Sequence, residues 1–324
     1  MKFGKIVYAL LVCACIPAWA ADTDWPSRPI RFVEPYAPGG AADITARTLS
    51  QHLTASLGQT VIIDNKTGAG GNIGTDIVAK SAPDGYTMLL AYTGPMLINQ
   101  YLYQNLPFDP ARDFVPVAMV ADAPLILVVH PSVPATDLTS LIAYARENPG
   151  KLFYGSSGTG GADHLAGELF NLRTGTKIVH VPYKGGAPAV LDLVAGRTQI
   201  EFVTIPGGLA HIRSGRLRPI AILSKQRFEL FPEVPTIEEA GLVDFDINNW
   251  YGLAMPAGTP APIVETMNAA VLAALEKPEL RARLLEVGVV PSWKSSADFA
   301  DFLKREAPKW ENIVRASGAK VEYA

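Results

Sequence analysis

The chain has 324 residues, of which 48% are hydrophobic and 18% are charged, a composition that excludes an intrinsically disordered protein. Its 28 basic and 31 acidic residues give a formal net charge of −3, so no basic excess indicates a nucleic-acid-binding protein. At roughly 150 residues per domain, the length predicts two domains, each large enough to have its own hydrophobic core.

The first twenty residues predict a secretory signal peptide. Lys2 and Lys5 form a short basic segment, residues 6–16 form an apolar run, and residues 18–20 (Ala-Trp-Ala) provide a signal-peptidase site. The apolar run is too short to span a bilayer, and a buried N-terminal helix is the other interpretation. Processing as a lipoprotein at Cys15 is an alternative to cleavage after residue 20.

Both cysteines, Cys13 and Cys15, lie in this segment, so the mature chain would form neither a disulfide nor a thiolate metal site. Cleavage would leave 26 basic and 31 acidic residues, a net charge of −5. Because later apolar runs do not reach the length of about 18 residues that a membrane span needs, we expect a soluble exported protein.

Strands, glycine-rich loops and helices alternate along the chain. In the first half we expect a strand at 30–33, a turn at 35–40, a helix at 42–57 ending at Gly58, a strand at 61–63, a loop at 67–72, a helix from 73 and a strand at 87–91. In the second half we expect a strand at 152–154, a loop at 155–161, a helix with a Leu165, Leu169 and Leu172 stripe ending at Gly175, a strand at 178–181, a loop at 182–186 and a helix from 187 to Gly196.

This alternation predicts an α/β fold with mainly parallel, doubly wound sheets, and the similar units in each half predict two similar lobes. Residues 115–130 and 245–255 are extended apolar segments that we interpret as connections between the lobes. The chain would then leave the first lobe and later return to it. From residue 263 onward the apolar spacing predicts C-terminal helices.

The glycine-rich loops at 35–40, 67–72 and 155–161 predict a binding site for a small anion. Each loop precedes a helix, and a helix N-terminus exposes unpaired N–H groups and a partial positive charge. Glycine lets a ligand approach these groups closely, so an anion fits there. The loop at 182–186 adds Lys184 as a candidate charge partner for the anion.

Other kinds of site are poorly supported by the spacing. The glycines at 68 and 158 begin no complete dinucleotide-binding fingerprint, and no P-loop motif occurs. Ser157 with His164 or His180 and an aspartate would be needed for a secreted serine hydrolase, yet the nucleophile-elbow motif is incomplete and serines before helices are usually caps. The five histidines show no metal-ligand spacing.

Eight segments together resemble one family. They are WPSRPI at 25–30, PYAPGG at 35–40 followed by Asp43 and Arg47, GAGGNIG at 68–74, PDGYT at 83–87, GTGGADHLAGELF at 158–170, VPYKG at 181–185, FPEVPT at 231–236 and PAGTP at 256–260. On these segments the chain resembles the Bug family, the periplasmic solute-binding proteins of tripartite tricarboxylate transporters. The resemblance extends over essentially the whole mature chain.

The resemblance implies a two-lobed periplasmic-binding-protein fold of type II (Venus flytrap), each lobe a mainly parallel sheet flanked by helices. We place the signal peptide at 1–20, lobe 1 at 21–122 plus 245–324, and lobe 2 at 123–244. It also implies a binding protein and not an enzyme, with no metal and no organic cofactor.

The family's ligand-binding positions fall on glycine-rich loops of both lobes. In lobe 1 they are Pro38, Gly39, Gly40, Asp43, Gly70, Gly71 and Asn72, and in lobe 2 they are Ser156, Ser157, Thr159, Gly160, Gly161, Tyr183 and Lys184. Thr93 and Thr204 follow strands in segments where family members differ, so we expect them to influence solute specificity.

We therefore expect a monomeric periplasmic protein that captures a small organic anion, a mono-, di- or tricarboxylate, by hinge closure. Its partners would be the integral-membrane subunits of the cognate transporter, and no nucleic acid. A module that presents its ligand to a membrane receptor kinase is the alternative in a different functional class.

Overall fold

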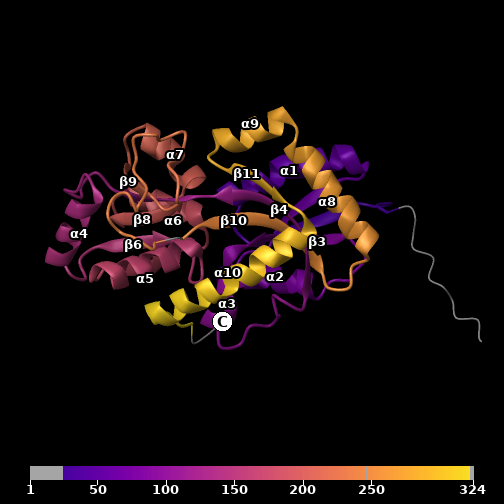
Figure 1. Ribbon diagram of the computed structural model, residues 1–324, viewed down its shortest axis with the longest axis horizontal. Coiled ribbons are helices and arrows are strands. Elements are labelled where there is room, and N and C mark those ends of the chain that lie inside the picture. The colour runs from indigo at the N-terminus through magenta and orange to yellow at the C-terminus, as the bar shows by residue number, and fades with distance from the viewer. Residues whose placement is uncertain (1–24, 246, 322–324) are drawn as a thin grey trace, which may run out of the picture.

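The computed structural model describes residues 25–245 and 247–321 and contains two β-sheets, each flanked by helices (Figure 1). The predicted signal peptide at residues 1–20 lies outside the described residues. The two sheets follow one another along the long axis of the molecule, with the strands of the first half of the chain mainly in one sheet. The expected α/β architecture with two sheets is confirmed.

The first sheet has six strands in the order β11-β4-β10-β3-β1-β2. Their bounds are β1 Ile30–Glu34, β2 Val61–Asn65, β3 Thr87–Tyr92, β4 Phe114–Ala123, β10 Asn249–Pro256 and β11 Val290–Lys294. Strand β1 is parallel to β2 and β3, whereas β10 is antiparallel to β3 and β4, and β11 is antiparallel to β4.

The second sheet has five strands in the order β7-β6-β8-β5-β9. Their bounds are β5 Leu125–Val129, β6 Phe153–Ser156, β7 Val179–Pro182, β8 Ile200–Thr204 and β9 Arg218–Ile222. Strand β6 is parallel to β7 and β8, whereas β5 is antiparallel to β8 and β9.

Both sheets are therefore mixed, which corrects the expectation that they are mainly parallel. Strand β5 enters the second sheet directly from the first, and β10 brings the chain back into the first sheet. Each begins at the junction and runs away from it, while the parallel strands β1, β3, β6 and β8 end there. A strand that starts where its neighbours end must pair with them in the antiparallel sense.

Helices cover the sheets and join them. Their bounds are α1 Ala41–Leu57, α2 Asn72–Ala79, α3 Asn99–Leu102, α4 Leu138–Glu147, α5 Ala162–Thr174, α6 Gly186–Val194, α7 Ile205–Arg213, α8 Ala261–Leu275, α9 Pro278–Glu286 and α10 Ser296–Ser317, with short turns η1 Ala69–Gly71 and η2 Gly94–Ile98. The long α10 contacts β4 of the first sheet and α5 beside the second, so the C-terminal helix braces both (Figure 1).

The chain crosses between the sheets at two places. Strand β4 ends at Ala123 and β5 begins at Leu125, so the first crossing is at Pro124. The return crossing lies between β9 and β10. One continuous core cluster includes Val33 of the first sheet and Phe202 of the second, so the two sheets are also joined by packing.

Most of the expected helix boundaries are confirmed. Helices α1 and α5 end at Gly58 and Gly175, whose φ values of 68° and 66° are in the left-handed region that glycine adopts without a steric penalty. The expected apolar stripe of α5 is wrong at Leu172, which is 51% exposed. Phe170 is fully buried instead, because that side of the helix faces the core.

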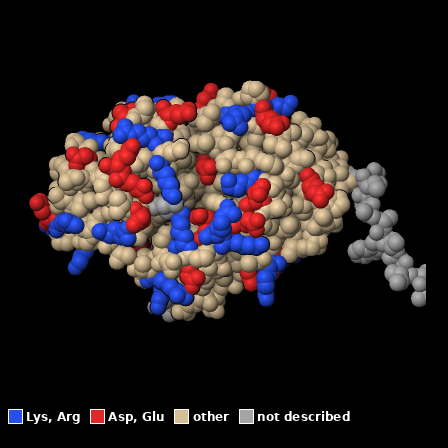
Figure 2. Space-filling view, viewed as in Figure 1, with Lys and Arg blue, Asp and Glu red and all other residues tan. Residues whose placement is uncertain are grey.

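The surface carries charges of both signs. On the face shown in Figure 2, Lys and Arg are interspersed with Asp and Glu, and no extended basic field is present there. Within residues 25–245 and 247–321, no helix combines the length and apolar character needed to cross a membrane.

Candidate ligand-binding site

A cavity of about 310 Å³ lies where the parallel strands of both sheets end. Its lining combines Tyr36 and Tyr92, at the ends of β1 and β3, with Ser157 and Thr204, at the ends of β6 and β8. Ligands of open α/β sheets collect at this end of the strands, and the volume suits a small metabolite. Among the described residues, the lining contains no Lys or Arg.

Four helices begin at the wall of this cavity. Their N-cap residues, Gly40 of α1, Gly161 of α5, Gly185 of α6 and Thr204 of α7, all line it. None of these four N-caps makes a side-chain capping hydrogen bond in the part of the chain described. Their first turns therefore bring N–H groups without intrahelical partners, and partial positive charge, to one place. This arrangement suits a carboxylate.

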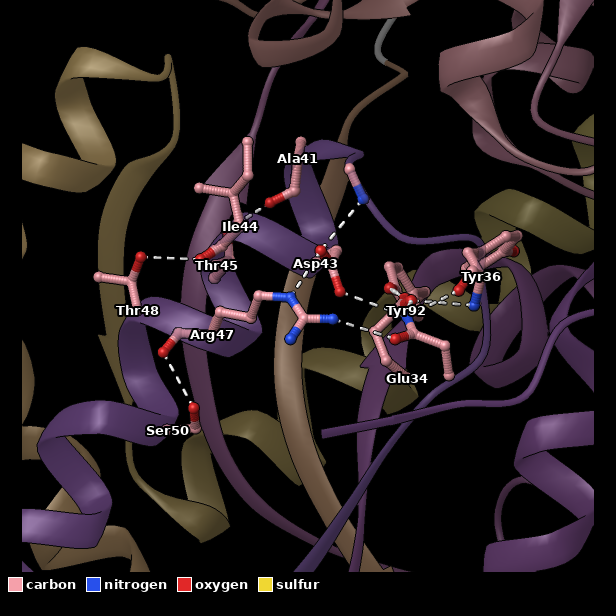
Figure 3. Close-up of polar contacts among 12 residues, drawn as sticks. Glu34, Tyr36, Ala41, Asp43, Ile44, Thr45, Arg47, Thr48, Ser50 and Tyr92 are labelled. Carbon is pink, nitrogen blue, oxygen red and sulfur yellow. Dashed lines mark hydrogen bonds and ion pairs between the residues drawn. The ribbon is translucent and has the colours of Figure 1, made fainter. Parts of the chain in front are cut away.

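The loop before α1 is fixed by the buried carboxylate of Asp43. Its Oδ2 accepts a hydrogen bond from the Gly39 N–H at 3.0 Å and another from Arg47 Nε at 2.9 Å (Figure 3). Burial raises the pKa of Asp43, but the bonds from Arg47 and Gly39 outweigh it and leave the pKa below its ordinary value. The N–H of Gly39 is thus committed to the loop, although Gly39 itself lines the cavity.

A second carboxyl group, that of Glu34, is fully buried behind the cavity wall. The Tyr92 hydroxyl hydrogen-bonds to it, and its Oε2 accepts from Asn65 Nδ2 at 2.8 Å and from the Tyr36 N–H at 3.2 Å (Figure 3). Burial outweighs these bonds and raises the pKa of Glu34 to about 8. At neutral pH the group is mostly uncharged, so it adds little repulsion for an anion in the cavity.

On the other side of the cavity, Asp163 organises the loop before α5. It accepts hydrogen bonds from the Ser157 N–H, from Ser157 Oγ at 3.0 Å and from the His164 N–H at 2.9 Å. Burial raises the pKa of Asp163 in spite of these bonds. The Ser157 N–H, like that of Gly39, is therefore used inside the protein.

The residues needed for a serine hydrolase are not assembled at Ser157. Its hydroxyl bonds to Asp163 and, among the residues that the structure describes, to no histidine. His180 pairs with the buried Ser156 instead, at 2.6 Å. The described residues also contain no group of three or more His, Cys, Asp or Glu arranged to hold a metal ion.

The loops at 68–72 and 158–161 meet beside the cavity and join the two lobes. The Tyr103 hydroxyl donates to the Thr159 carbonyl at 3.1 Å, and Asn99 Nδ2 donates to the Gly70 carbonyl at 3.2 Å. A Cβ atom on Gly70 would lie 2.5 Å from the Thr159 carbonyl oxygen, and one on Gly160 would lie 2.4 Å from Asn99 Oδ1. Only glycine allows this close approach of the two loops.

Comparison with known proteins identifies the family of a chain built in this way. The model of the tripartite tricarboxylate transporter family receptor, TctC, matches residues 45–319. Protein BugT of Bordetella pertussis is 40% identical over 304 residues, which cover 94% of this chain and 93% of BugT.

Two solved structures are also similar over nearly their whole length. Rpa4515 of R. palustris with adipate has a TM-score of 0.89 and 36% identity, covering 92% of this chain and all of that one. MatC of Rhodopseudomonas palustris with bound malate has a TM-score of 0.86 and 32% identity, covering 90% and 100%. The chain belongs to the TctC, or Bug, family. It is a periplasmic solute-binding receptor, as the sequence segments indicated.

In this TctC-family protein, the predicted binding residues fall into two groups. Those that line the cavity are Gly39, Gly40, Ser157, Gly161 and Thr204. Those outside its lining are Pro38, Asp43, Gly70, Gly71, Asn72, Thr93, Ser156, Thr159, Gly160, Tyr183 and Lys184.

The residues outside the lining have other partners or positions. Asn72 accepts a hydrogen bond from Asn99 at 2.6 Å, Thr93 donates to Asn249 at 2.9 Å, and Tyr183 donates to Asp192 at 2.8 Å. Pro38 and Lys184 are exposed.

Several groups of the cavity wall were not predicted from the sequence. They are Glu201 of β8, the tyrosines Tyr36, Tyr92 and Tyr251, and the polar residues Asn249 and His211. An acidic residue inside the otherwise apolar strand IEFVT was a signal for Glu201, because charged side chains are rarely buried without a role. The tyrosines gave no such signal, since their spacing is that of an ordinary core.

Proposed function

We propose that this receptor captures a small organic anion through a carboxylate group and passes it to the integral-membrane subunits of a tripartite tricarboxylate transporter. The observation that carries the proposal is the convergence of four helix N-termini, whose N-cap residues make no side-chain capping hydrogen bond, on one cavity without a Lys or Arg in its described lining. Each terminus carries roughly half a positive charge. The Ile205 N–H of α7 already donates to the Pro124 carbonyl and the His164 N–H of α5 to Asp163, so the donors for a ligand are the other N–H groups of the first turns. The adipate and malate of the two similar structures support a carboxylate.

The ligand is captured by closure of the two lobes around a hinge. We assign residues 21–122 and 245–324 to lobe 1 and residues 123–244 to lobe 2, a division supported by the crossing at Pro124 and by the strand order of the sheets. The ligand touches the helix N-termini of both lobes and so stabilises the closed arrangement. The family supports a periplasmic location, and we propose a monomer exported by the signal peptide at 1–20.

The predicted residues then have two roles. Gly40, Gly161 and their neighbours in the lining contact the ligand directly, while the loops of Gly70 and Thr159 form the contact that holds the lobes together. Ser157 supports the loop before α5 and is not a nucleophile. Ser157→Ala should therefore weaken ligand binding, whereas in a serine hydrolase the same substitution would abolish turnover.

Thermal unfolding of the purified protein with a panel of mono-, di- and tricarboxylates tests the proposal. A ligand present at about 100 times its dissociation constant should stabilise the protein by roughly 2.7 kcal/mol. Uncharged amides of the same acids are the matched controls and should give no shift. If no organic anion raises the melting temperature, carboxylate capture is refuted.

Purification of the tagged receptor from solubilised membranes tests the partner. Recovery of the integral-membrane transporter subunits is expected. Recovery of a receptor kinase in their place would show that the protein presents its ligand to a sensor and would refute the transport role.

A further inference from the structure

One carboxyl group of the cavity wall belongs to Glu201, a residue of the second sheet. Glu201 lies on β8, where successive side chains point to opposite faces of the sheet. Ile200 and Phe202 belong to the core beneath α5, whereas Val203 packs with Val190 of α6 on the other face. Glu201 shares that second face, lines the cavity and is 1% exposed.

Both carboxyl oxygens of Glu201 are buried and have no hydrogen-bond partner among the described residues. Burying a carboxyl group without a partner is costly, and a purely structural position would favour an apolar residue. Every other buried acid described above is satisfied, Glu34 by Tyr92 and Asn65, and Asp163 by the loop before α5. Glu201 is therefore placed to contact a polar group of a ligand that enters the cavity.

The surroundings of Glu201 select the charge of that group. Burial and the nearby charge of Asp163 raise the pKa of Glu201 well above its ordinary value, so the uncharged form of Glu201 is favoured while no ligand cation is bound. The described lining offers no Lys or Arg, and burial and Arg216 lower the pKa of its His211, so the protein supplies no cation. A ligand ammonium group would favour the ionised form of Glu201 and pair with it, whereas the described lining offers no cationic side chain to pair with a second ligand carboxylate.

We propose that Glu201 is a specificity residue that receives a protonated amine of the ligand, so that the solute carries both a carboxylate and an ammonium group. The carboxylate lies at the helix N-termini and the ammonium donates its hydrogen bonds to the unpaired oxygens of Glu201. The inference rests on the proposed function, since it concerns the same cavity, and it narrows the solute to an amino-carboxylate.

Isothermal titration calorimetry at pH 7 with matched compounds tests this assignment. The probes are succinate, glutarate and adipate, their 2-amino derivatives, and the ω-amino acids in which one carboxylate is replaced by an ammonium group. We expect at least one amino compound to bind ten or more times more tightly than the dicarboxylate of the same length. The comparison uses the wild-type protein and needs no variant.

Two substitutions of Glu201 and one control variant then assign the effect to Glu201. Glu201→Gln should weaken the tightest amino compound tenfold or more and change dicarboxylate binding less than threefold. Glu168→Gln, the same change in the same lobe outside the cavity lining, should change neither. Glu201→Met should abolish binding of the amino compound while leaving the melting temperature of the free protein equal to or above that of the wild type, because an unpaired buried carboxyl has been removed.

The outcomes separate this inference from the proposed function. If dicarboxylates bind and no amino compound binds more tightly, Glu201 has been assigned wrongly and carboxylate capture stands. A Glu201→Met protein that loses much of its thermal stability would show that Glu201 is structural and would equally overturn the assignment. If no compound of either class binds, both proposals fail together.

Discussion

Replacing Gly70 with alanine should weaken ligand binding far more than it weakens the fold. Gly70 has a φ of +62°, and a Cβ atom there would lie 2.5 Å from the backbone oxygen of Thr159 in the opposite lobe. An ordinary contact begins at 3.4 Å, so the two loops must separate by about 0.9 Å. The Tyr103 hydroxyl, 2.8 Å away, is the end of a side chain and can turn aside more easily.

The size of the loss in affinity depends on which conformation contains this clash. Overpacking of a close contact costs about 1–3 kcal/mol. Here it destabilises only the arrangement in which the two lobes touch. If the ligand binds that arrangement, its dissociation constant should rise by about 5- to 150-fold. A left-handed alanine also costs about 1–2 kcal/mol of folding stability, whatever its surroundings.

Gly58 provides a matched control for the backbone cost. Its φ is +68°, nearly that of Gly70, but a Cβ atom there meets nothing within 4 Å. Gly58→Ala should therefore show the same loss of stability with no change in affinity. Titration calorimetry with the tightest carboxylate of the panel, and calorimetric unfolding of each variant, measure the two effects. Equal dissociation constants for Gly70→Ala and Gly58→Ala would refute the role of this contact in closure.

Three further predictions concern buried ionisable groups. Because the pKa of Glu34 is raised to about 8, its contribution to stability is complete below pH 4.5 and is lost as the pH rises through 8. Between pH 4.5 and pH 9, the free energy of unfolding measured in urea should therefore fall by about 4–5 kcal/mol more for the wild type than for Glu34→Gln. The burial of His180 lowers its pKa to about 4, so its contribution to stability is present above pH 6.5 and is lost as the pH falls toward 4. Between pH 7 and pH 4, the free energy of unfolding in the same measurement should fall by about 3 kcal/mol less for His180→Phe than for the wild type. Asp163→Asn should lower stability by about 1–3 kcal/mol and weaken carboxylate binding, as seen by thermal unfolding and calorimetry, and unchanged binding would contradict its role in shaping the loop.

Much of the fold could be predicted from the sequence because interactions between neighbouring residues determine it. The glycines that end α1 and α5 and the apolar spacing between strands and loops depend on neighbouring residues, and they were predicted correctly. The pairing of β5 and β10 depends instead on how the chain passes between two sheets, which no local pattern records. For the same reason the mixed character of the sheets was not predicted.

At the site, the sequence located the loops but not the use of their N–H groups. Gly39 and Ser157 were expected to contact the ligand, yet Asp43 and Asp163 accept hydrogen bonds from their N–H groups. These bonds span four and six residues, and they depend on how each loop folds back on its helix. The close contact of Gly70 with Thr159 joins residues 89 positions apart and required the three-dimensional arrangement.

The same two carboxylates explain how a cavity without cationic side chains can hold an anion. By taking up the N–H groups of Gly39 and Ser157, Asp43 and Asp163 fix the loops in which the helix N-termini are presented, so the remaining donors need no rearrangement when a ligand arrives. Arg47 compensates the charge of Asp43, and burial favours the uncharged forms of Asp163 and Glu34. The acids thus order the cavity wall without adding much negative charge, and Glu201, the acid of the described lining whose oxygens have no hydrogen-bond partner, remains to distinguish between solutes.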